Sequence, residues 1–443
     1  MTDHPAPKPS KKKKPAYKKR RIDGKILKPE SLMMSYGYDP KWSEGSVKPP
    51  VFLTSTFIFE SAEEGEEHFN VMAGRSKAPE GTTGGLIYSR FNHPNVEIVE
   101  DRLALIESSE SACVCASGMG AISAMFFALL RPGDVVVYNA PLYGGTTTLI
   151  SNLLSQFDIK SVAVGSQCSG EDFEKALDKA AGLGPVKMVY VETPTNPTND
   201  IVDFEMLKQK IDDFTQKYGC DRPVTACDNT MLGPVFQTII PQGIDLAVYS
   251  LTKYIGGHSD LVAGVVCGSE DMIKKIRSTR GAMGLNLDPH TSWMISRSME
   301  TLTIRMERSA ETGRKVAKWL SDNPYVNVEL LHPDFIDCPD YQTIYKRQCS
   351  GPGSTFAFRV KKDIPRATIF KFLNSLELFK LAVSLGGTES LICHPASTTH
   401  SGVPLEQREA AGVTEGLIRL SIGLEHPDDL ILDLDQSFRK AFE

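Results

Sequence analysis

A lysine stands at the end of an apolar, strand-like run of this sequence. Residues 245–251 are mostly apolar, and Lys253 follows them between Thr252 and a glycine pair at 256–257. Burying a lysine as a cation is costly, so this position calls for a chemical reason. One reason is an imine between the lysine amine and an aldehyde cofactor, which removes the charge. Pyridoxal phosphate is such a cofactor, and it needs three supports: the lysine, donors for its phosphate and an acid at its ring nitrogen.

Donors for a phosphate are expected where a predicted strand meets a predicted helix. Ser117-Gly118-Met119-Gly120 fills such a turn. Glycines let the backbone approach a ligand closely, and the start of a helix offers free N–H groups to an anion. Short turns of this kind are common, so the motif alone is weak. The hydroxyls of Ser250 and Thr252, close to Lys253, strengthen the prediction.

An acid for the ring nitrogen is predicted at Asp228. This residue ends the apolar run 224–227, and the carboxyl ends of strands are where α/β folds bind ligands. A lone aspartate here would more often cap a helix or a turn. The Ser-x-Thr-Lys sequence that follows makes the ligand interpretation stronger. Tyr143 opens another predicted helix, where its flat ring could stack on a flat cofactor or simply fill the core.

The elements that must position these residues alternate along the chain. Strands are predicted at 111–116, 135–139, 159–164, 188–192, 224–227, 245–251 and 261–267, and helices at 60–72, 96–107, 121–130, 143–154, 170–181 and 203–218. This alternation predicts the α/β class, with a large domain built on a mostly parallel sheet.

The pattern changes after residue 288 and predicts a smaller C-terminal α+β domain. Its expected elements are a long or broken helix at 291–322, strands at 355–360, 381–385 and 417–422, and helices at 364–376 and 428–442. The resulting division is a basic, disordered extension at 1–28, an N-terminal arm at 29–85 with a loop at 73–85, a large domain at 86–288 and a small domain at 289–443.

Composition excludes several other classes of protein. The 443 residues carry a net charge of −6, but residues 1–28 alone hold 11 basic and 2 acidic side chains, so the remainder carries −15. An acidic body does not fit nucleic-acid binding, and no apolar run is long enough to span a membrane. Nine scattered cysteines indicate reduced thiols rather than disulfides or a metal site, which favours a cytoplasmic protein.

At this point the motifs resemble a known family, the Cys/Met-metabolism enzymes that use pyridoxal phosphate. The resemblance begins near Ser35, extends to the C-terminus, and implies the fold type I of PLP-dependent transferases. It rests on motifs that occur in the family order: Tyr88-Ser89-Arg90, Ser117-Gly118-Met119-Gly120, Tyr143-Gly144-Gly145-Thr146, Glu192-Thr193-Pro194-Thr195-Asn196-Pro197, Asp228-Asn229-Thr230, Ser250-Leu251-Thr252-Lys253-Tyr254, Ser384-Leu385-Gly386-Gly387 and Leu417-Ile418-Arg419-Leu420-Ser421-Ile422-Gly423-Leu424-Glu425.

The resemblance also implies a role for each matching residue. Lys253 forms the imine and shuttles protons, Asp228 pairs with the ring nitrogen, and Tyr143 stacks on the ring and acts as acid or base. The phosphate is bound by Gly118, Met119, Ser250 and Thr252. Tyr88 and Arg90 reach the phosphate of a neighbouring subunit, which implies a homo-oligomer built from dimers, expected to be a tetramer. Arg419 binds the substrate carboxylate, with Ser384 and Asn196 nearby; a planar guanidinium matches a carboxylate well.

The implied reaction acts on a γ-substituted L-amino acid and has two possible outcomes. Elimination releases a 2-oxo acid and ammonia, as in the γ-lyases, and replacement adds a thiol, as in cystathionine γ-synthase or the O-acylhomoserine sulfhydrylases. The stretch 394–400 resembles the lyases and sulfhydrylases, which favours elimination from methionine, cystathionine, homocysteine or a canavanine-like compound. Gly145 stands where methionine γ-lyases carry a cysteine, which argues against methionine in particular.

Two readings from other classes explain less of the sequence. Ser250-x-x-Lys253 also fits the Ser-x-x-Lys of acyl enzymes, but Ser259-Asp260 is not followed by the asparagine which that class needs. A scaffold or nucleic-acid protein with a basic tail would leave all the site motifs unexplained.

Overall fold

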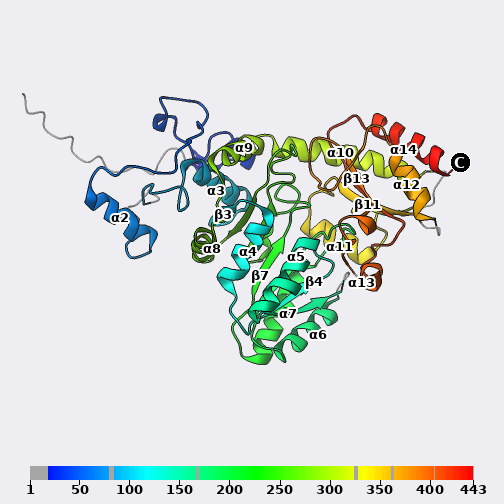
Figure 1. The fold of residues 1–443 in the computed structure, drawn as a ribbon, viewed down its shortest axis with the longest axis horizontal. Helices are drawn as coiled ribbons and strands as arrows, with labels where there is room; N and C mark the ends of the chain where they lie inside the picture. The colour runs from blue at the N-terminus through cyan, green and yellow to red at the C-terminus, as the bar shows by residue number, and fades with distance from the viewer. Residues whose placement is uncertain are drawn as a thin grey trace, which may run out of the picture.

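The computed structural model describes residues 18–78, 84–165, 169–323, 328–360, 364–403 and 405–442. The described chain forms a seven-stranded sheet and a five-stranded sheet, each packed against hydrophobic cores of its own, and a short two-stranded hairpin. Figure 1 shows the large domain at the centre, the small C-terminal domain on the right and the N-terminal arm reaching out on the left. The part of the chain described here contains no helix that is long and apolar enough to cross a membrane.

The large sheet has seven strands in the order β3-β9-β8-β7-β6-β4-β5. They are β3 (Ser111–Cys115), β4 (Val135–Asn139), β5 (Lys160–Val164), β6 (Val186–Glu192), β7 (Val224–Asp228), β8 (Leu246–Ser250) and β9 (Gly264–Gly268). β9 pairs antiparallel with both of its neighbours, and the other pairs are parallel. The expected mostly parallel sheet is therefore confirmed.

Helices cover both faces of this sheet, which is why its strands are apolar along their whole length. One face packs against α3 (Pro94–Glu107), α6 (Gly170–Ala181), α7 (Phe204–Tyr218) and α9 (Pro289–Met299). The other packs against α4 (Gly118–Leu129), α8 (Glu270–Met283) and the irregular helix that starts with α5 (Gly144–Thr148). Successive strand residues alternate between the two cores, as Val135, Val136 and Val137 do. Neither α8 nor the irregularity after α5 was predicted.

The small sheet has the order β10-β11-β14-β13-β12. Its elements are β10 (Val328–Leu331), β11 (Thr355–Val360), β12 (Lys380–Leu381), β13 (Leu391–Cys393), β14 (Leu417–Ser421), α10 (Leu302–Ser321), α11 (Pro339–Gln348), α12 (Arg366–Asn374), α13 (Leu405–Ala410) and α14 (Pro427–Phe442). Helices α10, α12 and α14 pack on one face through residues such as Leu320, Phe372 and Phe438. The smaller α+β domain is confirmed.

The expected strand at 381–385 is wrong beyond its first residue. Only Lys380–Leu381 pair, as β12, and the backbone then turns at Ser384 with φ 98° and at Gly386 with φ 76°. A positive φ cannot continue a strand and is uncommon for a residue with a side chain. The turn places Ser384 at the candidate site described below.

Helices α9 and α10 carry the chain from one core to the other. Ile295, Met299 and Leu302 pack into the core of the large sheet, whereas Val316 and Leu320 pack into that of the small sheet. We therefore propose that the change of domain occurs within α10 rather than directly after residue 288.

Part of the expected disordered extension has a defined structure. Residues 1–17 lie outside the described part of the chain, but Arg21–Ile22 (β1) and Lys25–Ile26 (β2) pair as a short hairpin. The Lys18 amine donates to Asp101 at 2.8 Å, and Arg20 donates to the Tyr36 hydroxyl at 3.0 Å. These contacts tie the segment to the body, which its basic composition did not predict.

The N-terminal arm follows the hairpin. It contains the short helix α1 (Pro29–Leu32), a single turn at Pro40–Trp42 and α2 (Ala62–Met72), close to the helix expected at 60–72. Thr56 forms an isolated antiparallel bridge with Tyr88, which joins the arm to the start of the large domain. Residues 79–83 of the expected loop lie outside the described part of the chain.

Candidate active site

Three polar side chains end three neighbouring strands on one face of the large sheet. Glu192 lies opposite Asp228 in the register of β6 and β7, and Asp228 lies opposite Val248, two residues before Ser250. Because strand residues alternate, Glu192, Asp228 and Ser250 face the same side as Tyr190, Ala226 and Val248, which pack with α4. The carboxyl ends of these strands therefore converge on the start of α4.

The start of α4 forms a tight cradle against β8 and β9. The Ser117 hydroxyl caps the helix by accepting from the Gly120 N–H at 2.9 Å. A Cβ on Gly118 would lie 3.2 Å from the Ser250 Oγ, and one on Gly264 would lie 2.4 Å from the Ser117 carbonyl. The Thr252 Oγ1 lies within hydrogen-bond distance of the Ala263 backbone. The first N–H groups of the helix and the Ser250 hydroxyl are thus brought together where a phosphate could bind.

Asp228 is buried and held in place by Thr230. The Thr230 backbone N–H and hydroxyl both donate to the Asp228 Oδ1, at 3.0 and 2.6 Å, and the Ser250 N–H donates to the same hydroxyl. Burial raises the pKa of Asp228, while the two bonds from Thr230 oppose that rise. A cationic ring nitrogen would provide the missing counter-charge.

Lys253 extends from the loop after β8 towards the small domain. Its amine donates to the Ser384 Oγ at 2.7 Å. Burial, with a smaller contribution from the Arg419 charge, lowers the pKa of Lys253 to about 8. A minority of this amine is therefore neutral near physiological pH, but far more than for an ordinary lysine, and this neutral form is the one that imine formation and proton abstraction require.

Arg419 lies in the middle strand of the small sheet and is 3 % exposed. It donates to the Asn196 Oδ1 at 3.1 Å and to the Ser384 carbonyl at 2.6 Å. Its Nε is buried and has no hydrogen-bond partner among the described residues. A guanidinium with an unused buried donor is a suitable site for a carboxylate.

Tyr143 precedes α5 and is 48 % exposed, so it borders the site rather than filling the core. A Cβ on Gly145 would lie 2.7 Å from the Tyr143 ring and 3.0 Å from the Met119 sulfur. The Tyr143 ring, Gly145 and Met119 are therefore close neighbours at the start of α4.

Tyr88 and Arg90 are not brought to this site within the chain. Both are exposed, and Arg90 donates to the Gly281 carbonyl and lies over the Phe91 ring. Within the described part of the chain, neither makes a hydrogen bond or ion pair with the other candidate residues.

Two residues with a clear place in the site were missed by the sequence reasoning. Thr230 orients Asp228, and Glu192 accepts N–H bonds from Tyr143 and Asn196. Both belong to quoted motifs, and an aspartate followed two residues later by threonine is a pattern for a local side-chain turn. That pattern is the signal that could have assigned Thr230.

The residues fit pyridoxal phosphate at each of its ends. A Cβ on Gly118 would be crowded by Ser250, 3.1 Å from its Cβ, and the glycine there allows a close backbone approach to a phosphate. Asp228 is a buried carboxylate for the ring nitrogen, and the Lys253 amine has a lowered pKa.

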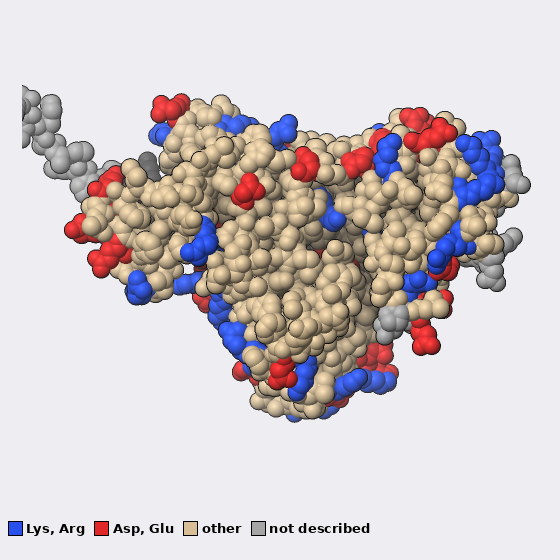
Figure 2. Space-filling model, viewed as in Figure 1, with Lys and Arg blue, Asp and Glu red and all other residues tan. Residues whose placement is uncertain are grey.

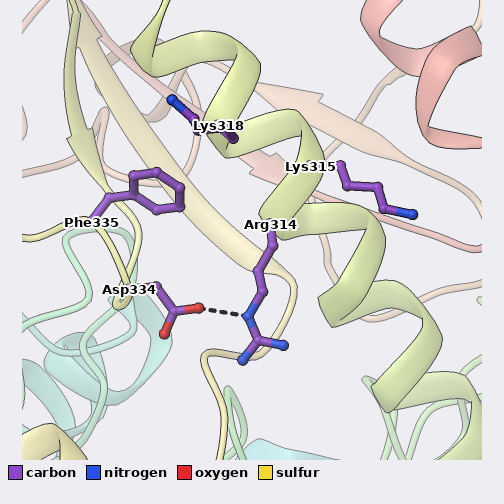
Figure 3. A pocket seen from close by; sticks show the side chains of 5 residues that line it. All are labelled: Arg314, Lys315, Lys318, Asp334 and Phe335. Atoms are coloured by element: carbon purple, nitrogen blue, oxygen red, sulfur yellow. Dashed lines mark hydrogen bonds and ion pairs between the residues drawn. The ribbon is translucent and has the colours of Figure 1, made fainter.

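A shallow hollow elsewhere on the surface is a poorer candidate. It lies between α10 and the segment after β10, and it is lined by Arg314, Lys315, Lys318, Asp334 and Phe335 (Figure 3). Each cation already has a carboxylate partner: Arg314 pairs with Asp334 at 2.6 Å, Lys315 with Glu311 at 3.0 Å and Lys318 with Asp322 at 2.6 Å. Nothing in it resembles the lysine and acid described above.

Known proteins are similar to this chain in both sequence and fold. The model of the family described as Cys/Met metabolism PLP-dependent enzymes matches residues 30–439. The chain is 36 % identical to L-methionine gamma-lyase of Pseudomonas putida, over 92 % of this chain and 96 % of that protein. It is 34 % identical to human cystathionine gamma-lyase, over 91 % and 92 %. The crystal structure of cystathionine gamma synthase from Xanthomonas oryzae pv. oryzae, in complex with aminoacrylate and cysteine, superposes with a TM-score of 0.81 at 31 % identity, covering 94 % of this chain and 99 % of that one.

The fold and these matches define an enzyme that depends on pyridoxal phosphate. The chain belongs to the Cys/Met metabolism family of such enzymes.

Proposed function

We propose that this enzyme eliminates the γ-substituent of an L-amino acid such as methionine, cystathionine, homocysteine or a canavanine-like compound. The observation that carries the proposal is the contact of Lys253 and Arg419 with one residue, Ser384. This contact puts a proton-accepting amine beside a carboxylate-binding guanidinium, so an amino acid held by Arg419 presents its Cα to Lys253. The similarity to L-methionine and cystathionine gamma-lyases over nine-tenths of the chain supports the same reaction.

Each site residue has a defined task in this mechanism. When bound, the cofactor supplies an aldehyde for the substrate amine and a cationic ring that accepts electrons. Arg419 binds the carboxylate, and Asn196 and Ser384 fix the guanidinium. The Lys253 amine removes the Cα proton and then moves protons along the substrate. Asp228 keeps the ring nitrogen protonated.

The half-exposed Tyr143 is placed at the opening of the site. Its phenol can donate a proton to the leaving γ-heteroatom, a role that the Lys253 ammonium can share. Gly118, Met119, Ser250 and Thr252 would hold the phosphate of the cofactor. The substrate thus lies between the large sheet and the small sheet.

A second candidate is γ-replacement, in which a thiol takes the place of the leaving group. The similarity to a cystathionine gamma synthase structure, with a TM-score of 0.81, supports γ-replacement as this second candidate. Both reactions use the same proton-moving groups, so these residues do not separate them.

The test is product analysis by mass spectrometry. The purified enzyme is incubated with methionine, cystathionine, homocysteine, canavanine, O-acetylhomoserine and O-succinylhomoserine, each with and without a thiol. A 2-oxo acid formed without thiol supports elimination and identifies the leaving group. A product that forms only with thiol would replace this proposal by γ-replacement.

We further propose a homo-oligomer built from dimers, as a tetramer, in the cytoplasm. Several apolar side chains of the arm lie open, including Leu53 at 80 % and Ile58 at 95 % exposure. Figure 2 shows that the middle of one broad face, over α4 and α5, also carries few charged side chains. If a second copy covered the arm, Tyr88 and Arg90 of the first copy would reach the phosphate site of the second. The cytoplasmic location rests on the nine scattered cysteines.

A further inference from the structure

We propose that Glu192 is a positioning residue, whose two carboxyl oxygens hold the Tyr143 and Asn196 loops in one arrangement. This inference rests on the proposed function, because it concerns how the cofactor and the substrate carboxylate are aligned. Glu192 has no role in the mechanism derived above, and its side chain reaches neither Lys253 nor Arg419 by a hydrogen bond among the described residues.

The geometry of the Glu192 carboxyl group is that of a bridge. Its Oε2 accepts from the Tyr143 N–H at 2.7 Å, and its Oε1 accepts from the Asn196 N–H at 3.0 Å. The two donors belong to different loops, one before α5 and one after β6. Each loop carries one candidate site residue, and one carboxyl group fixes the distance between them.

The backbone of Glu192 is itself fixed. Its N–H donates to the Asn139 side chain at 2.8 Å, and its carbonyl accepts from the same side chain at 3.0 Å. Asn139 ends the neighbouring strand β4. The bridge therefore stands on the rigid edge of the sheet and not on a mobile loop.

The bridge continues into the substrate site. The Asn196 amide oxygen accepts from Arg419, which donates to Ser384, and Ser384 accepts from Lys253. A line of hydrogen bonds thus joins the Tyr143 backbone to the Lys253 amine through Glu192. A shift of the Asn196 loop would turn the Arg419 guanidinium away from the substrate carboxylate.

The surroundings of Glu192 link its charge to the occupancy of the site. The side chain is 4 % exposed and lies beside Asp228. Burial and the Asp228 charge raise the pKa of Glu192 to about 8, although the hydrogen bonds from the two N–H groups act in the opposite direction. A cationic ring paired with Asp228 would relieve that repulsion, so cofactor binding and an ionised bridge favour each other.

The test replaces Glu192 and a matched control. Glu192→Gln keeps the size but offers one oxygen, so one of the two N–H donors faces an amide NH₂ group. Glu107→Gln is the control, since both oxygens of this buried carboxyl also accept hydrogen bonds: Oε1 from the Ile239 and Ile240 N–H groups and Oε2 from the Tyr249 hydroxyl, and none of these donors is a candidate site residue. We expect Glu192→Gln to raise KM about tenfold, as loss of one buried hydrogen bond predicts. We also expect it to change the visible circular dichroism of the bound cofactor.

The control separates positioning from simple stabilisation. Glu107→Gln should lower the unfolding temperature without changing KM or the cofactor signal. If both variants alter kinetics and dichroism alike, Glu192 is only structural and the proposal fails. Glu192→Asp serves if the glutamine variant does not fold: it keeps the charge but is too short to reach both loops, so a normal KM and signal would also overturn the proposal.

The dichroism of the bound cofactor tests the role of Glu192 independently of the proposed elimination reaction. If the wild-type enzyme released no 2-oxo acid from any substrate, the elimination proposal would fail. The dichroism and the dissociation constant of pyridoxal phosphate would still decide whether Glu192 positions the site.

Discussion

The Lys253 amine donates to Ser384 at 2.7 Å and lies close enough to Arg419 for that charge to act on it. At the scale of single residues, this environment lowers the pKa of the Lys253 amine to about 8, which raises the fraction that is neutral and nucleophilic near pH 7. The same Arg419 that is proposed to bind substrate also disfavours the charged amine. In this proposal one cation serves both the binding of substrate and the reactivity of Lys253.

Replacing Lys253 tests the cofactor assignment directly. We expect Lys253→Ala to lose at least about 10³-fold in turnover, because an activated amine is removed from both imine formation and proton transfer. Borohydride should then no longer fix the cofactor to the protein. Lys274→Ala, on α8 in the large domain, is the control and should keep both properties. Near-normal turnover in Lys253→Ala would remove the basis of the site.

The rate of cofactor capture by the apoenzyme should depend on pH through Lys253. Only the neutral amine attacks an aldehyde, and burial with Arg419 lowers its pKa to about 8. The rate should therefore rise with pH up to about 8 and level off above it, instead of rising towards the ordinary lysine value of about 10.4. Stopped-flow absorbance after mixing with pyridoxal phosphate measures it. In Arg419→Met the plateau should move to higher pH, and an unmoved profile would show that Arg419 does not act on the amine.

At the scale of elements, the sequence predicted most of what carries the site. Apolar strands, the turn at Ser117–Gly120 and the aspartate that ends β7 each have a local pattern, and the structure puts them on one edge of the sheet. Ser384 was assigned to the site from its motif, but the sequence predicted a strand where the structure has a turn. The reason is that nothing in the local sequence indicates a serine with φ 98°. That conformation is maintained by contacts with Lys253 and Arg419, which come from distant parts of the chain.

The meeting of β9 with the start of α4 gives a prediction for Gly264. A methyl group there would lie 2.4 Å from the Ser117 carbonyl and 2.5 Å from the Gly118 Cα. Overpacking of this kind costs about 1–3 kcal/mol, and it pushes on the proposed phosphate cradle. We expect Gly264→Ala to weaken binding of pyridoxal phosphate about tenfold or more, measured by titration of the apoenzyme.

Gly165 provides the control for this change. It lies just after β5, and a Cβ there would meet no atom of the described residues within 4 Å. Gly165→Ala should leave cofactor affinity unchanged. Equal affinity in the two variants would show that the cradle does not depend on close packing at β9.

At the scale of the whole molecule, the N-terminal arm stands out because it exposes large apolar side chains in the single chain. The isolated bridge between Thr56 and Tyr88 brings the part of the arm that carries Leu53 and Ile58 alongside the exposed Tyr88 and Arg90. Local sequence patterns predict elements within one chain and do not give the geometry of a contact between two copies. The motif around Arg90 suggested the proposed contact, whose geometry would involve a second chain.

Arg90→Ala tests the shared site. We expect it to lower the occupancy of pyridoxal phosphate at low protein concentration and to shift the protein towards smaller species in sedimentation. The reason is that a phosphate would lose a charged partner, worth about 1.5–3 kcal/mol, that comes from another subunit. Unchanged occupancy and sedimentation on dilution would reject the role across subunits.

The line from Lys253 through Ser384 and Arg419 to Asn196 crosses from one sheet to the other and back. Neither core alone contains a complete set of groups, while α10 belongs to both. Catalytic competence therefore reports on how the two halves are docked, not on whether each is folded. In a gentle denaturant series, activity should disappear before the far-ultraviolet helical signal does, which makes turnover the more sensitive gauge of this protein's integrity.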